Sequence, residues 1–67
     1  MPTLSINGTV HHYDSLPSLP QILEFQGLTG RRIAVELNGE IVPRSRQDEV
    51  QLVSGDRLEI VVAVGGG

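Results

Sequence analysis

Two Asn-Gly pairs, at residues 7–8 and 38–39, do most to limit what this chain can fold into. Asn-Gly is the strongest two-residue signal for a turn between antiparallel strands, because both residues tolerate the positive φ that this turn requires. Alternating or β-branched runs flank each pair, at 3–6 and 9–13 around the first and at 32–37 and 40–42 around the second. The sequence therefore predicts two β-hairpins.

The register of each hairpin conflicts with its apolar pattern. A strict two-residue loop pairs Ile6 with Thr9 in the first hairpin and turns the apolar Val10 away from the face of Ile6. We therefore expect a bulge or a wider loop there. In the second hairpin, strict pairing places Glu40 on the face of Leu37, so either the register is bulged or Glu40 lies at an exposed rim.

Between the hairpins, the sequence predicts a short helix over residues 19–26. Ser18 can cap its N-terminus, and Pro20 is tolerated in its first turn, where a backbone N–H has no helical partner in any case. Gly27 suits the left-handed residue with which many helices end. After the second hairpin, the polar segment 44–49 can hold one turn of 3₁₀ helix.

Residues 57–62 form the most apolar strand of the chain. Alternation turns Leu58, Ile60 and Val62 toward the core, and the nearly continuous apolar run suits a central position beside the first strand. The order of the elements predicts an α+β fold in which a mixed sheet of four to five strands packs against one helix.

Size and composition limit the classes of protein to which the chain can belong. Its 67 residues suffice for one domain, and the absence of cysteine excludes disulfides and thiolate chemistry. A net charge of −3, with only one Tyr and one Phe, argues against nucleic-acid binding. The chain lacks an apolar run of about 20 residues, and residues 1–3 lack the basic start of a secretory signal. We therefore expect a cytoplasmic protein with no membrane partner.

The titratable residues predict neither an enzyme nor a metal site. His11 and His12 are neighbours on a strand, so they point to opposite faces and cannot both bind one ion without distortion. Glu36 and Glu40 can be pictured as an acid–base pair across the second hairpin. Surface charge is the better interpretation, because no pocket is evident in so small a domain.

Three consecutive glycines, residues 65–67, follow shortly after the most apolar strand. Glycine packs nothing and is costly to order, so we divide the chain into a domain over residues 1–64 and a flexible tail over 65–67. When stretched, residues 64–67 reach about 13 Å, which suits a carboxylate that is threaded into a partner's narrow active site. A frayed end is the ordinary alternative.

Several segments resemble the sulfur carriers of thiamine biosynthesis, which belong to the ubiquitin-like β-grasp family. Residues 33–44 (IAVELNGEIVPR) are similar to that family's AVxxN…IVPR pattern, and residues 55–61 (GDRLEIV) and the final Gly66-Gly67 match as well. The resemblance spans the whole chain, is most specific from residue 33 onward, and implies the β-grasp fold. The family pattern ends in a glycine pair, whereas this chain has three glycines, which leaves open the register of the tail in a partner's channel.

The resemblance implies a carrier rather than a catalyst. In that family, an adenylating enzyme uses ATP and magnesium to activate the C-terminal glycine, and sulfur from a persulfide donor converts it to a thiocarboxylate. Thiazole synthase then takes the sulfur. Gly67 would bear the thiocarboxylate, with Gly66 as its slim neighbour. The order of steps is chemically reasonable, because a carboxylate is a poor electrophile until it carries a leaving group.

Partners are expected to dock on the exposed face of the last strand, beside the tail. Alternation turns Val61 and Ala63 outward as a small apolar pair. Val64 and Gly65 continue from them into the tail, and Arg44 is a candidate charge at the rim. These five residues are the predicted partner contacts.

Other functions stay open at this stage. The small subunit of molybdopterin synthase resembles the same fold and tail, with a different acceptor enzyme. A ubiquitin-like modifier would form isopeptide bonds through Gly67, and a plain interaction module would not use the glycines. Because all five basic residues of the chain are arginines, it cannot accept a second copy on a lysine. We hypothesise that this protects an activated tail from self-acylation.

Overall fold

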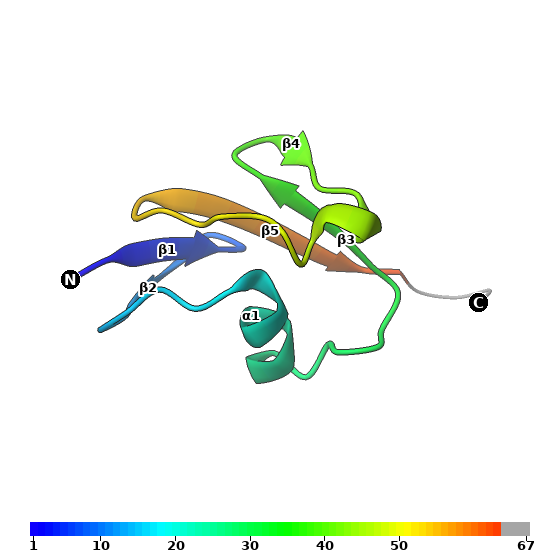
Figure 1. Ribbon diagram of the computed structural model, residues 1–67, viewed down its shortest axis with the longest axis horizontal. Helices are drawn as coiled ribbons and strands as arrows, with labels where there is room; N and C mark the ends of the chain where they lie inside the picture. The colour runs from blue at the N-terminus through cyan, green and yellow to red at the C-terminus, as the bar shows by residue number, and fades with distance from the viewer. Residues whose placement is uncertain (64–67) are drawn as a thin grey trace.

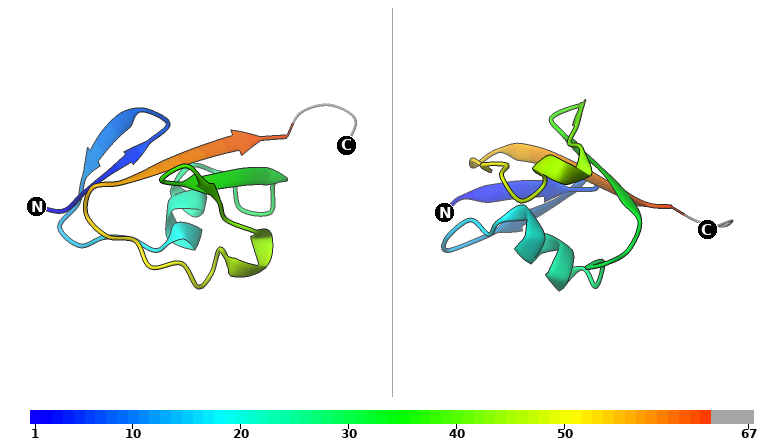
Figure 2. Two further views of the ribbon diagram at one scale, coloured as in Figure 1. Left: turned by 90° about the horizontal axis from the view of Figure 1, so that it is seen from above. Right: turned by 45° about the vertical axis from the view of Figure 1, so that its right-hand side comes forward.

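Residues 1–63, the part of the chain that this computed structural model describes, form a five-stranded mixed sheet with one α-helix packed on one face (Figures 1 and 2). The strand order is β2-β1-β5-β3-β4, and only β1 and β5 run parallel. The elements are β1 (Thr3–Ile6), β2 (Thr9–His12), α1 (Leu19–Phe25), β3 (Ile33–Leu37), β4 (Glu40–Ile41), the 3₁₀ turn η1 (Arg44–Arg46) and β5 (Asp56–Val62). The predicted α+β architecture is confirmed.

Strand β5 lies in the centre of the sheet, beside β1, as its apolar sequence predicts. Its inward residues Leu58 and Ile60 are buried between the sheet and α1, while Val62 is half-buried. The buried apolar side chains form one cluster: Leu4, Ile6, Leu19, Ile22, Leu23, Val35, Val42, Leu58 and Ile60. The core is therefore formed by α1, β1, β3, β5 and Val42. Strand β5 joins the first hairpin to the second, because it lies between β1 and β3.

The expected bulge in the first hairpin is wrong. Ile6 pairs with Thr9 across a two-residue turn in which Asn7 and Gly8 both have positive φ, 50° and 85°. Val10 consequently faces away from α1 and is 59% exposed. The preference of Asn-Gly for this turn outweighs the burial of one valine, because β2 is an edge strand and adds nothing to the buried cluster.

The second hairpin also keeps strict pairing, which decides between the two alternatives for Glu40. Leu37 pairs with Glu40, and the Glu40 side chain is exposed at the rim of the sheet. Strand β4 ends at Ile41, one residue earlier than expected. Val42 nevertheless continues the register, because its N–H donates to the Val35 carbonyl at 2.8 Å and its side chain is buried.

Helix α1 has the predicted caps and ends one residue earlier than predicted. The Gln21 N–H donates to Ser18 Oγ at 3.2 Å, and the Ser18 N–H donates to Gln21 Oε1 at 2.9 Å, which forms a capping box. Gly27 has a φ of 72°, and the Leu28 N–H donates to the Leu23 carbonyl at 2.8 Å. These contacts stabilise a helix that is too short to be stable alone.

The polar connection after β4 contains the predicted 3₁₀ turn, η1. The Arg46 N–H donates to the Pro43 carbonyl at 2.8 Å and begins this turn. Val50 and Leu52 then pack against the buried cluster as partly buried side chains, as expected. This connection places η1 on the same side of the sheet as α1 (Figure 2).

Asn7 extends the pairing of β5 beyond the end of β1. Its Nδ2 donates to the Ile60 carbonyl at 3.1 Å, and the Ile60 N–H donates to its Oδ1 at 2.7 Å. The side-chain amide therefore takes the place of a further residue of β1. The first turn is fixed to a strand that lies more than fifty residues away in the sequence, which explains why the turn keeps its strict register.

Asn38 holds the start of β5 in a similar way. Its Oδ1 accepts from the Arg57 N–H at 2.9 Å, and its Nδ2 donates to Asp56 Oδ1 at 2.9 Å. The second oxygen of Asp56 accepts from the Val53 N–H at 2.8 Å, so this buried carboxylate is hydrogen-bonded through both oxygens. Asn38 and Asp56, which lie in the segments that resemble the sulfur-carrier family, therefore stabilise the fold.

We expect Asn38→Gly to lower the free energy of unfolding by about 1–3 kcal/mol, because it removes two hydrogen bonds of about 0.5–1.5 kcal/mol each. Glycine keeps the positive φ of this turn accessible. Asp56→Ala leaves the Val53 N–H without its partner and should cost at least as much. Urea denaturation of the two single variants and the double variant measures the coupling. If the losses in free energy of unfolding of the two single variants add up to that of the double variant, the direct Asn38–Asp56 contact is contradicted.

Candidate functional site

Strand β5 directs the chain to one end of the sheet, where Ala63 is fixed by a hydrogen bond. The Ala63 N–H donates to the Arg32 carbonyl at 2.9 Å. Gly66, Gly67 and the predicted contacts Val64 and Gly65 lie outside the described residues, as does the predicted boundary between residues 64 and 65. The described part of the site is therefore the surface around Ala63.

The sheet face opposite α1 carries an exposed apolar patch near Ala63. Val61 is 59% exposed and Ala63 is exposed, so both turn outward as predicted. Val61 pairs directly with the exposed Ala34 of β3, and Ile41 of β4 is 76% exposed on the same face. Sequence reasoning missed Ala34 and Ile41, although alternation from the buried Val35 turns Ala34 outward. We call Ala34, Ile41, Val61 and Ala63 the outer patch.

The two glutamates that resembled an acid–base pair lie on opposite faces of the sheet. Glu36 pairs with Glu59 and Ile41 on the outer face, whereas Glu40 pairs with Leu37 on the side of α1. They cannot act on one substrate atom together. Glu36 is half-buried on the outer face, whereas Glu40 is exposed, as a surface charge is, and borders a cavity that was not predicted.

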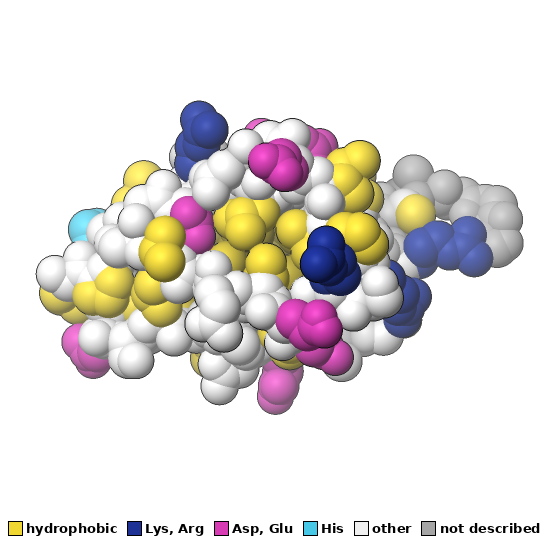
Figure 3. Space-filling view, turned by 45° about the horizontal axis from the view of Figure 1, so that its top comes forward, with side chains coloured by type: hydrophobic (Ala, Val, Ile, Leu, Met, Phe, Trp, Pro, Cys, Tyr) yellow, Lys and Arg dark blue, Asp and Glu magenta, His cyan; other side chains and the backbone are white. Residues whose placement is uncertain are grey.

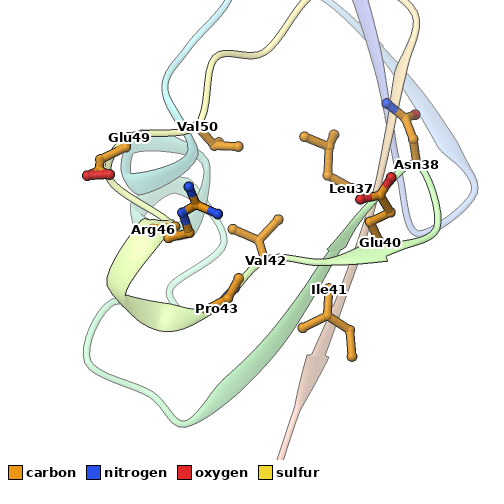
Figure 4. A pocket seen from close by; sticks show the side chains of 9 residues that line it. All are labelled: Leu37, Asn38, Glu40, Ile41, Val42, Pro43, Arg46, Glu49 and Val50. Carbon is orange, nitrogen blue, oxygen red and sulfur yellow. The ribbon is translucent and has the colours of Figure 1, made fainter.

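A cavity of about 430 Å³ lies beside Glu40 (Figure 4). Leu37, Val42 and Val50 point toward its centre, with Glu40 at one side and Arg46 at the other. Its described lining residues are Leu37, Asn38, Glu40, Ile41, Val42, Pro43, Arg46, Glu49 and Val50. They include no hydroxyl, histidine or thiol that could act as a nucleophile. Its apolar centre can accept an apolar side chain, with the carboxylates of Glu40 and Glu49 among the polar groups of its lining.

The two histidines occupy opposite faces, as expected. His11 pairs with Leu4 and His12 with Thr3, and the His11 ring stacks on Tyr13 with 6.4 Å between the ring centroids. Within residues 1–63, no group of three or more His, Cys, Asp or Glu side chains is placed to hold a metal ion. Helix α1, the α-helix of this described part, is too short to cross a membrane.

Arg44 begins η1 and is exposed. It shares with Arg31 a second cavity, of about 290 Å³, between α1, η1 and the segment that leads into β3. The structure thus places the predicted rim charge at the same end of the sheet as Ala63. The neighbouring Arg31 was not singled out from the sequence, because nothing local in the sequence relates residue 31 to residue 44.

Comparison with known proteins decides the family. Residues 4–67 match the model of the ThiS family, and this range includes the final glycines. The chain belongs to the ThiS family. The crystal structure of a thiamine biosynthesis protein (ThiS) from Geobacter metallireducens is similar, with a TM-score of 0.78 and 28% identity over 97% of this chain and 99% of that one. The predicted ubiquitin-like β-grasp fold and family resemblance are confirmed.

Two relatives match nearly the whole of this chain but differ in their own length. A thiazole synthase from Paramagnetospirillum magneticum is 41% identical over 64 residues, which are 96% of this ThiS-family chain and 20% of the relative. The ycf40 protein of Pyropia yezoensis is 32% identical over 65 residues, 97% of this chain and 92% of that protein. The chain therefore spans about a fifth of the thiazole synthase and nearly all of ycf40.

Proposed function

We propose that this chain is a sulfur carrier of thiamine biosynthesis, with sulfur held as a thiocarboxylate on Gly67. The observation that supports it most directly is that the ThiS family match runs through the glycine pair, Gly66-Gly67. The chain acts as a carrier and not as a catalyst.

The proposed chemistry takes place on the terminal carboxylate. Within an adenylating enzyme that uses ATP and magnesium, a carboxylate oxygen of Gly67 attacks the α-phosphorus, and pyrophosphate leaves. A persulfide sulfur then attacks the acyl carbon, and AMP leaves. A thiol reduces the resulting acyl disulfide, which releases the thiocarboxylate. Glycine suits this role because no side chain obstructs either attack.

Thiazole synthase is the proposed acceptor of the sulfur. In the thiazole synthase from Paramagnetospirillum magneticum, the segment similar to 96% of this chain makes up 20% of the polypeptide. A second thiazole synthase, from Magnetococcus marinus, is 31% identical and has the same coverage. Joining of a carrier-like segment to that enzyme favours thiazole formation over the molybdopterin and modifier alternatives.

Intact mass tests the proposal. The full chain is incubated with the adenylating enzyme, ATP, magnesium, a persulfide donor and a thiol. We expect a mass increase that corresponds to replacement of one oxygen by sulfur, located on the C-terminal peptide. Omission of ATP is the control and should leave the mass unchanged. An unchanged mass with an enzyme that is active on another carrier would reject the proposal, and conjugates with lysine-bearing proteins would support the modifier alternative instead.

The adenylating enzyme is expected to dock on the outer patch, in which Val61 is the exposed residue of β5. Val61→Glu should lower kcat/KM for adenylation at least tenfold, because a charge buried without a partner in an interface is strongly unfavourable. Val10→Glu is the matched control, since Val10 has the same 59% exposure on the same sheet face but lies on the edge strand β2. Equal losses in the two variants would show that docking does not use Val61.

A further inference from the structure

Four of the five arginines lie at the end of the sheet where β5 ends. Arg31 and Arg32 precede β3, and Arg44 and Arg46 are the first and last residues of η1. The Ala63 N–H donates to the Arg32 carbonyl, and Arg31 and Arg44 line one cavity. Figure 1 shows η1, the segment before β3 and the last residues of β5 at the same end. In Figure 3, most dark blue side chains lie in the right-hand half of this face, and another stands at its upper left edge.

The charge of the chain is therefore divided unevenly along the sequence. Residues 27–32 and 43–49 contain four arginines, Asp48 and Glu49, which gives a net charge of +2. The other residues contain Arg57 and six carboxylates, which gives −5 and accounts for the total of −3. Two segments of an acidic chain are therefore basic, and Glu40 lies across the cavity of Figure 4 from Arg46.

The guanidinium groups of these arginines make no hydrogen bond to another part of the described chain. Within residues 1–63, the side-chain hydrogen bonds use Ser, Asn, Asp and Gln groups and no guanidinium. All four arginines are exposed. Like charges gathered at one end repel one another in the isolated chain, so their grouping indicates a partner of opposite charge.

We propose that Arg31, Arg32, Arg44 and Arg46, which we call the arginine rim, dock on an acidic surface of the enzyme that adenylates Gly67. This inference rests on the proposed function and adds the chemistry of the partner surface. A guanidinium binds a carboxylate through two parallel hydrogen bonds, which makes arginine well suited to protein carboxylates.

A protein surface fits the arginine rim better than a free phosphate does. The four side chains are spread over two separate segments rather than converging on one point. Asp48 also lines the cavity that Arg31 and Arg44 share, and its carboxylate repels a compact anion placed there. An extended acidic surface can contact the arginines without entering this cavity.

The test compares charge reversals at the two ends of the molecule. Arg31→Glu, Arg32→Glu, Arg44→Glu and Arg46→Glu are each compared with Arg57→Glu, which changes the net charge equally but lies at the start of β5. Calorimetric titration of each full chain into the adenylating enzyme without ATP gives Kd at low and high salt. At low salt we expect each rim variant to bind about tenfold more weakly than wild type, whereas the Arg57 variant binds as wild type. High salt should weaken wild-type binding and reduce the difference.

Three results would overturn docking through the arginine rim. Equal Kd values for rim variants and the Arg57 variant would overturn the arginine rim, as would wild-type binding that does not respond to salt. Binding of inorganic pyrophosphate to the isolated chain, lost in Arg31→Glu and Arg44→Glu, would overturn it in favour of a compact anion site. Because the titration contains no ATP, it is independent of the mass measurement. A missing mass shift in wild type rejects the proposed chemistry alone.

Discussion

Removal of Gly66 and Gly67 should abolish thiocarboxylate formation and leave the free energy of unfolding unchanged. The truncated chain is shorter by about 7 Å when extended, and it places Val64 next to the terminal residue. A β-branched side chain would then stand where the proposed channel accepts only glycine. Stability should not respond, because the buried cluster extends from Leu4 to Ile60. Intact mass and urea denaturation measure the two quantities.

Removal of a single glycine is the matched control for this truncation. Because residues 65–67 are identical, deletion of any one of them leaves the same chain, which still ends in a glycine pair. We expect this variant to form thiocarboxylate, with a change in rate that reports the register of the tail. Sulfur loading of the doubly truncated chain at the wild-type rate would show that the glycine pair is incidental and would favour the interaction-module alternative.

Leu58→Ala should lower the free energy of unfolding by about 3–5 kcal/mol, a large part of the 5–15 kcal/mol typical of whole domains. Leu58 is 1% exposed and pairs with Ile6 of β1 on one side and Leu37 of β3 on the other. Its truncation leaves a cavity at the centre of the sheet. The cavity cannot easily close, because β5 is held between β1 and β3 by the hydrogen bonds of the sheet.

Val61→Ala on the same strand is the control for Leu58→Ala. The Val61 side chain is largely in contact with solvent, so its truncation should cost less than about 1 kcal/mol. Denaturant unfolding followed by circular dichroism measures both variants. Similar costs at the two positions would show that β5 does not divide the sheet into a buried and an exposed face as described.

Much of the described site could be predicted from local patterns. Alternation along β5 is sufficient to turn Val61 and Ala63 outward and Leu58 inward, because successive side chains of a strand point to opposite faces. The Ser18 cap and the glycine that ends α1 are also local signals, and both were predicted correctly. The exposed Ala34 was available by the same reasoning, whereas the position of Ile41 depended on the register of its hairpin.

The sequence by itself determined the elements, their order and the side of each strand that is buried, because these depend on residue spacing and turn chemistry. Only the tertiary structure decided between the alternative registers of the hairpins and brought the arginines of separate segments together. Asn7 is hydrogen-bonded to Ile60, and Arg31 and Arg44 line one cavity between α1 and η1. Such contacts join residues that are far apart in the chain. No local pattern contains them, since they arise only when the sheet and helix pack around a common core.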